Sequence, residues 1–255
     1  MHTRFALVRR PGPRLAQGEL THLARTPVDL DLALEQWEGY AAALRCAGWQ
    51  TVEVPPADEC PDAVFVEDAV VVYGDLAVVT RPGAPSRRSE TAGVEHTVRA
   101  LGYRVGHIAA PGTLDGGDVL KHDGTVWVGR SGRTDDEGIR QLAVHLAPLG
   151  AEVVAVPTTK VLHLKSAVTA LPDGTVVGYP PLVDDGTAYP RFLAVDEEPG
   201  SHVVLLGENR LLMAASAAAT AARFEAMGYA VSTVDISQFE RLEGCVTCLS
   251  VRLRG

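Results

Sequence analysis

The chain has 255 residues, of which 46% are hydrophobic and 22% charged, a composition typical of a globular protein with a sizeable core. Its net charge of −9 and its lack of a Lys/Arg-rich tract argue against a nucleic-acid partner, and no apolar run approaches the roughly 18 residues that cross a membrane. Four cysteines without a secretory signal are typical of reduced thiols, which predicts a cytoplasmic protein.

The N-terminal part of the sequence predicts a strand, a helix and a second strand. The first strand is the short apolar run Phe5–Val8, and a loop that contains Gly18-Glu19-Leu20 follows it. Asp29 or Asp31 is placed to cap a helix that ends at Gly48. Its apolar stripe consists of Leu34, Trp37, Ala41 and Leu44. The second strand is expected over 50–54 and ends at two prolines.

Four units of the same pattern follow, each with two strands joined by a short turn, then a helix and a third strand. The turns contain Gly and Asp, as in Gly74-Asp75 and Asp123-Gly124, which favours hairpins. The expected strands are 69–73, 76–80 and 103–108; 118–121, 125–129 and 152–156; 166–171 and 175–178; and 202–206, 210–213 and 229–234. The helix of the first unit carries Val94, Val98 and Leu101, and that of the second begins near Thr134. The helical pattern of the third unit is weak and rich in proline, and the helix of the fourth spans about 214–227. A last strand is expected over 246–252.

Repeats of roughly 45 residues are typical of radial or linear arrays. If the last strand (246–252) pairs with the first (Phe5–Val8), the terminal segments form a fifth unit, and the array has no unpaired edge strand. We therefore predict a closed five-module α/β propeller in one domain over residues 1–255. The alternative is an open, doubly wound α/β sheet, which accounts poorly for the hairpins because its parallel strands are joined through helices.

Residues with reactive side chains lie just before the first strand of several units. They are Asp68 in the first unit, Asp115 in the second, His163 in the third and Cys248 in the fifth. Equivalent positions of a radial array converge on its axis, so we expect these four side chains to meet. Singly, each has a simpler interpretation: the aspartates as turn residues, the histidine as a core residue and the cysteine as a small buried hydrophobe. Their common position favours a shared site.

Cys245 and Cys248 also form a C-x-x-C motif, which occurs in redox and zinc sites. A redox C-x-x-C normally begins a helix, whereas this segment contains β-branched residues and is terminal. A structural zinc site needs a second pair of ligands at short spacing, and Cys46 and Cys60 do not provide one. Hydrolytic chemistry at Cys248 is therefore favoured over both alternatives.

The chain resembles the dimethylarginine dimethylaminohydrolases, which belong to the guanidine-modifying or pentein superfamily. The resemblance extends from the N-terminal loop to the C-terminal strand, and many motifs match in order, which makes it specific. The motifs are residues 61–68, 80–88, 112–118, 132–134, 162–166 and 246–250. The resemblance implies a pentein fold, no metal or cofactor, and hydrolysis of Nω-methylated arginines to citrulline and a methylamine.

The resemblance also implies a role for individual residues. Cys248 matches the nucleophile, His163 the general acid and base, and Asp115 a carboxylate near the reacting guanidinium. The remaining matches are substrate contacts: Arg87 and Arg133 for the α-carboxylate, Asp62, Glu67 and Asp68 for nitrogen-bearing groups, and Leu20, on a mobile lid, and Leu242 through their backbone. Arg87 could instead be a solvated loop residue, with Arg88 as the true partner of the carboxylate.

The implied mechanism has a covalent thiouronium intermediate on Cys248, and we hypothesise that the cationic substrate itself helps this thiol to ionise. Cys245 stands where the family more often has glycine, and it could form an inhibitory oxidised pair with Cys248 if the strand geometry allows. The expected partner is a small cationic amino acid, without nucleic acid or membrane, and the protein is expected to be a monomer or a homodimer.

Four alternatives for the function remain open. Arginine deiminases resemble the core but usually carry a helical insertion, for which 255 residues leave no room. Agmatine has no carboxylate, so an enzyme that acts on it would not need Arg87 and Arg133; an amidinotransferase is a further possibility within the superfamily. The alternative of a different class is a non-catalytic binding module that uses its C-x-x-C as a thiol sensor.

Overall fold

The computed structural model describes residues 4–254, which form five three-stranded sheets. In every sheet the first strand pairs antiparallel with the second, and the second pairs parallel with the third. The strands are, sheet by sheet, β3 (Val70–Tyr73), β4 (Leu76–Val79) and β5 (Arg104–His107); β6 (Val119–His122), β7 (Thr125–Arg130) and β8 (Glu152–Pro157); β9 (Val168–Ala170), β10 (Val176–Gly178) and β11 (Phe192–Ala194); β12 (Val204–Gly207), β13 (Arg210–Ala214) and β14 (Ala230–Val234); and β15 (Val251–Arg254), β1 (Arg4–Val8) and β2 (Gln50–Glu53).

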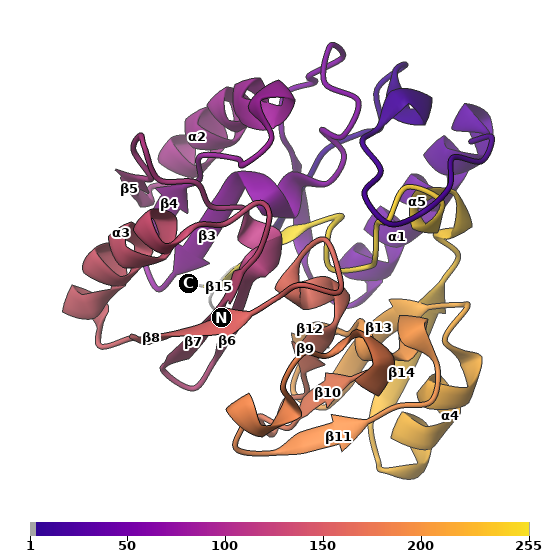
Figure 1. The fold of residues 1–255 in the computed structure, drawn as a ribbon. Helices are drawn as coiled ribbons and strands as arrows, with labels where there is room; N and C mark the ends of the chain where they lie inside the picture. Colours follow the sequence, from indigo (N-terminus) through magenta and orange to yellow (C-terminus); the bar gives the residue numbers. More distant parts are fainter. Residues whose placement is uncertain (1–3, 255) are drawn as a thin grey trace.

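The pairing of the two ends of the chain is confirmed. Strand β1 is antiparallel to β15, with Phe5 opposite Leu253, so the termini together complete the fifth sheet. The first strands of all five sheets, β3, β6, β9, β12 and β15, contribute residues to a single central cavity of about 330 Å³. The modules are therefore arranged around a common centre, with α2 (Thr91–Ala100), α3 (Asp136–Leu146) and α4 (Ala218–Ala226) at the periphery (Figure 1). The predicted five-module α/β propeller is confirmed.

Two helices differ from the sequence prediction in physically simple ways. In the third module, two short 3₁₀ turns at 180–182 and 186–188 replace the helix, and the first of them begins with two prolines. Proline lacks the N–H that an α-helix interior requires. In the fourth module α4 begins at Ala218 rather than Ala214, because Ala214 extends β13 and pairs with Val234. A short helix, α5 (Ser237–Glu240), was not predicted.

The expectation that a strand begins at Val246 is wrong. Residues 245–248 form a turn, closed by the Cys248 N–H that donates to the Cys245 carbonyl at 3.0 Å, and β15 begins only at Val251. The carbonyls of this turn bond to distant segments rather than to a neighbouring strand: that of Cys248 accepts the Glu67 N–H at 3.2 Å. Cys248 therefore lies in a turn before the strand and is only 8% exposed.

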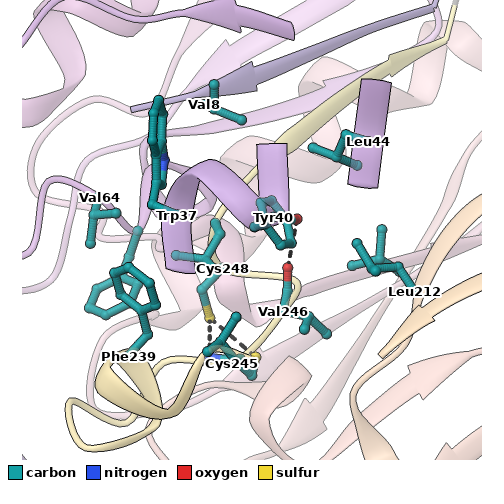
Figure 2. Close-up of a cluster of buried hydrophobic side chains, with 14 of the residues drawn as sticks. Val8, Trp37, Tyr40, Leu44, Val64, Leu212, Phe239, Cys245, Val246 and Cys248 are labelled. Carbon is teal, nitrogen blue, oxygen red and sulfur yellow. Dashed lines mark hydrogen bonds between the residues drawn. The ribbon is translucent and has the colours of Figure 1, made fainter. Parts of the chain in front are cut away.

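Helix α1 (Leu30–Cys46) packs against this turn. Asp29 caps the helix through the Leu32 N–H, and Trp37 and Leu44 pack in the same core cluster as Cys245 and Cys248. Figure 2 shows the fully buried Tyr40 of this helix, whose hydroxyl donates to the Val246 carbonyl at 2.8 Å. The same hydroxyl lies 2.7 Å from Ser250 Oγ. One side chain of α1 thus holds both ends of the segment that carries Cys248.

Replacing Tyr40 by phenylalanine is expected to lower the free energy of unfolding by about 1–3 kcal/mol, because the buried Val246 carbonyl loses its donor. Urea denaturation measures the change. Tyr103→Phe, at a half-buried position outside this network, is the matched control. Equal stability of the Tyr40 variant and wild type would contradict the structural role of this hydroxyl.

Across residues 4–254, no helix combines the length and apolar character needed to cross a membrane.

Candidate active site

A small cavity lies against the turn that contains Cys248. Its walls come from the loop that precedes α1, from the segments before β3 and β9, and from the segment between α5 and β15. The lining residues are Glu19, Asp62, Phe65, Asp68, Arg87, Arg133, Leu162, His163, Leu242, Glu243, Gly244 and Cys248. The enclosed volume is about 20 Å³, which is room for about one water molecule. Cys248 and His163 therefore face one closed cavity, as the common position in their modules predicts.

The imidazole of His163 lies between two buried carboxylates. Its Nε2 is 3.0 Å from Asp115 Oδ2, and its Nδ1 is 3.7 Å from Asp68 Oδ1. Asp115 is itself fixed, because its Oδ1 accepts the Gly83 N–H at 2.9 Å and its own N–H donates to the Thr134 hydroxyl at 3.1 Å. Asp115 does not line the cavity but lies behind the ring, where it orients the imidazole.

This environment changes the charge of His163. Burial lowers the pKa of the imidazole, but the Asp68 carboxylate, the hydrogen bond to Asp115 and the charge of Asp118 outweigh burial and raise the pKa to about 9. For Asp68, burial raises the pKa, but the charges of His163 and Arg87 outweigh it and lower the pKa to about 2. At neutral pH the cavity therefore holds an imidazolium beside a carboxylate.

Arg87 is bound by the protein's own groups. Its Nη1 donates to Asp68 Oδ2 at 2.6 Å, and its Nε and Nη2 donate to the two oxygens of Glu90 at 3.1 and 2.9 Å. Its Nη2 also reaches the carbonyls of Asp62 and Phe65. The residue is 5% exposed, so the idea of a solvated loop arginine is wrong. This guanidinium fixes Asp68 beside the histidine.

Arg133 has a different environment. Its side chain is 14% exposed, and its Nη2 pairs with Glu19 Oε2 at 2.9 Å, on the loop that precedes α1. The Glu19 N–H in turn donates to Asp62 Oδ2 at 3.1 Å, and burial raises the pKa of Asp62. Glu19 therefore already pairs with Arg133, the guanidinium that the resemblance assigns to the substrate α-carboxylate.

The three other predicted substrate contacts, Leu20, Glu67 and Leu242, lie in different surroundings. Leu242 lines the cavity, whereas Leu20 is half-buried and packs on the core cluster that contains Cys248. Glu67 faces the central cavity instead, where its Oε1 pairs with Lys165 Nζ at 2.6 Å. Direct contact of Glu67 with substrate stays a prediction.

Five residues of the cavity wall have no role predicted from the sequence: Glu19, Phe65, Leu162, Glu243 and Gly244. Each of them adjoins a residue or a motif that was assigned. Glu19 and Glu243 are next to Leu20 and Leu242, so the surrounding residues of those two positions were the available signal.

The two cysteines of the C-x-x-C motif touch each other, as Figure 2 shows. Their sulfur atoms are 3.2 Å apart, and the Cys245 N–H points to Cys248 Sγ at 3.5 Å. The turn brings them together, in place of the strand that was expected to separate them, and both are free thiols. Contact with Cys245, burial, and the carboxylates Glu67 and Asp68 raise the pKa of the Cys248 thiol. This direction agrees with a thiol that needs a bound cation to ionise.

A metal ion would find three potential ligands in the described part of the site. Asp68, Asp115 and His163 each place one ligand atom within 4.8 Å of the others. The same carboxylates already accept hydrogen bonds from Arg87, Gly83 and Gly117. Catalysis without a metal stays a prediction from the sequence.

Two curated relatives align with nearly the whole chain. The N(G),N(G)-dimethylarginine dimethylaminohydrolase of Streptomyces coelicolor is 63% identical over 254 residues, which cover 100% of this chain and 98% of that protein. The protein of the same name from Pseudomonas aeruginosa is 33% identical over 96% of this chain and 98% of its own length. No protein-family model matches the chain.

The chain is also similar to solved structures over nearly its whole length. A cysteine-to-serine variant of the Pseudomonas aeruginosa enzyme, complexed with citrulline, superimposes with a TM-score of 0.92 at 32% identity, over 99% of this chain and 100% of that one. The N-terminal domain of a cyanobacterial arginine dihydrolase superimposes with a TM-score of 0.85 over 99% and 98% of the chains. At 20% identity, this second likeness concerns the fold alone.

Proposed function

The chain belongs to the dimethylarginine dimethylaminohydrolase family, and from this premise we propose that it hydrolyses asymmetric dimethylarginine and monomethylarginine to citrulline and dimethylamine or methylamine. One observation carries the proposal: a thiol, Cys248, and an imidazole, His163, border one small cavity with several carboxylates. Carboxylates attract and orient a guanidinium cation, and a thiol supplies a soft nucleophile for its central carbon.

The two arginines of the site take different parts in substrate binding. Arg133 binds the α-carboxylate of the substrate, which displaces Glu19 from it. Arg87 acts mainly through Asp68, because its donors are engaged by Asp68, Glu90 and two carbonyls. Asp68 and Asp62 are the acceptors for the nitrogen-bearing groups of the substrate.

Replacing Arg133 by methionine is therefore expected to raise KM for asymmetric dimethylarginine by about 10- to 100-fold, with little change in stability, because a charge-assisted hydrogen bond contributes about 1.5–3 kcal/mol. Arg87→Met is expected instead to lower the free energy of unfolding by about 3–5 kcal/mol, because it leaves Asp68 and Glu90 as unpaired buried charges. Steady-state kinetics and urea denaturation measure the two effects. Arg88→Met is the control, and an increase of KM in that variant alone would transfer the carboxylate contact to Arg88.

The first half of the reaction forms the covalent intermediate. The bound cation lowers the pKa of Cys248, so that the thiol releases its proton to solvent and the thiolate sulfur attacks the guanidinium carbon. A carbon–sulfur bond forms and the bond to the methylated nitrogen breaks. His163 donates its proton to that nitrogen, so that a neutral amine leaves and a thiouronium stays on Cys248.

The second half uses the same imidazole as a base. Neutral His163 takes a proton from a water molecule, whose oxygen attacks the same carbon. The carbon–sulfur bond then breaks, and its electron pair returns to Cys248. The sulfur takes the remaining hydroxyl proton, and neutral citrulline is released. Asp115 keeps the ring in one orientation through both halves.

An assay of citrulline release from asymmetric dimethylarginine, monomethylarginine and arginine, with Cys248→Ser as the control, tests this function. We expect release from both methylated arginines. No release from any of the three compounds would refute an enzymatic role and favour the thiol-sensing module. Release from arginine but not from its methylated forms would replace the substrate by that of an arginine deiminase.

A cytoplasmic location is part of the proposal, and cell fractionation would test it. A monomer or a homodimer is the proposed assembly, which size-exclusion chromatography with light scattering would distinguish.

A further inference from the structure

The loop of residues 18–26, which we call the lid, contacts the cavity wall at two places. Glu19 pairs with Arg133 and bonds to Asp62, and the side chain of Glu243 holds the backbone of residues 21–23. Glu243 Oε1 accepts the backbone N–H groups of Thr21 at 2.9 Å, of Leu23 at 2.7 Å, and of His22 between them. Three successive N–H groups directed at one oxygen form an anion-binding concavity of the kind that backbone turns provide. Glu243 thus connects the lid to the segment that precedes Cys248.

The backbone at Glu243 has a conformation that favours glycine. Its φ is +60°, and the next residue, Gly244, donates its N–H to the Phe239 carbonyl at 2.9 Å, which ends helix α5. This is the left-handed position after a helix, where glycine is the common choice. A glutamate here is strained, and strain of this kind persists where the surroundings and the function require the side chain.

The second oxygen of the same carboxylate is available to a ligand. Glu243 Oε2 is buried and has no hydrogen-bond partner among the described residues. Glu243 lines the reaction cavity beside Cys248 and Gly244. A buried carboxylate oxygen without a donor is unfavourable, and a cationic amino acid in this cavity would carry N–H groups that satisfy it.

We propose that Glu243 is a positioning residue that latches the lid over bound substrate. Its Oε1 holds the lid backbone, and its Oε2 accepts an N–H group of the cationic substrate, so that substrate binding and lid closure strengthen each other. This inference rests on the proposed function for the nature of the substrate. Without substrate, Glu19 of the lid pairs with Arg133, and the substrate carboxylate takes the place of Glu19 in the latched state.

Three variants separate the latch from a purely structural role. Glu243→Gly removes the carboxylate and relieves the left-handed strain, and Glu243→Gln keeps an acceptor oxygen without the charge. Glu240→Gln is the matched control, because Glu240 bonds to Ser216 and lies outside the reaction cavity. The measurements are KM for asymmetric dimethylarginine, the exchange of the lid amide hydrogens, and the thermal midpoint.

We expect Glu243→Gly to raise KM by about tenfold or more and to accelerate amide exchange at Thr21, His22 and Leu23, while its thermal midpoint stays equal or rises. Glu243→Gln is expected to fall between this variant and wild type, and Glu240→Gln to match wild type.

The proposal is overturned if Glu243→Gly leaves KM unchanged, or if its lid amides exchange as slowly as those of wild type. A lower thermal midpoint with unchanged KM would assign Glu243 a structural role only. Amide exchange is measured on the protein without substrate, so the latch is tested even if no methylated arginine is turned over. A failure of the proposed function is thus distinguishable from a failure of this inference.

Discussion

Replacing Cys248 by serine is expected to lower kcat for asymmetric dimethylarginine by roughly 10⁴-fold, the scale of loss seen when an enzyme is deprived of its nucleophile. A neutral hydroxyl is a much weaker nucleophile than a thiolate, and a bound cation cannot lower the pKa of an alcohol far enough to ionise it at neutral pH. The variant changes one atom in the cavity wall, so binding of citrulline should persist. Citrulline release and calorimetric binding of citrulline measure the two properties.

Cys245→Ser is the matched control for this experiment. Its sulfur lies 3.2 Å from that of Cys248, but Cys245 does not line the reaction cavity. We expect the Cys245 variant to keep turnover within about tenfold of wild type, since the hydroxyl still donates a hydrogen bond to its neighbour. The opposite result, with an active Cys248 variant and an inactive Cys245 variant, would exchange the two assignments. Mass spectrometry of acid-quenched enzyme should detect the covalent adduct in wild type and in Cys245→Ser but not in Cys248→Ser.

The positions that meet in the site were predictable because each follows from a local pattern. Asp68, Asp115, His163 and Cys248 all precede the inner strand of a module, and the hairpin turns with Gly and Asp reveal where those strands begin. Radial repetition then brings equivalent positions together. The helices were predictable where an apolar stripe and a cap coincide, as in α1 with its Asp29 cap, and the proline-rich third module lacked both signals.

The features that could not be predicted depend on contacts between distant segments. The start of the expected strand 246–252 is replaced by a turn because Tyr40 and Glu67, which are remote in sequence, bond to the carbonyls of Val246 and Cys248. Arg87 is a buried structural charge because Asp68 and Glu90 surround it. The bond between Glu243 and the lid likewise joins opposite ends of the chain. Local periodicity contains no signal for such pairs.

Replacing His163 by asparagine is expected to lower kcat by roughly 10²- to 10⁴-fold, because the leaving amine loses its proton donor and the water loses its base. The pH dependence gives a sharper test. The pKa of His163 is about 9, so the wild-type enzyme should lose kcat/KM as the pH rises through about 9 and the acid form disappears. Rates measured between pH 6 and pH 10 would show this basic limb, and the residual activity of His163→Asn should lack it.

The pH dependence of protein stability and the Asp115→Asn variant test the pKa of His163 independently. The folded pKa of His163 lies above the value of about 6.5 for an unfolded histidine, so its protonated form stabilises the fold fully below about pH 6.5, and this contribution is lost as the pH rises through about 9. Asp115→Asn removes a carboxylate that raises the pKa of His163 and should move the basic limb of kcat/KM to lower pH. A basic limb that persists in His163→Asn, or that Asp115→Asn does not move, would assign the titration to another group.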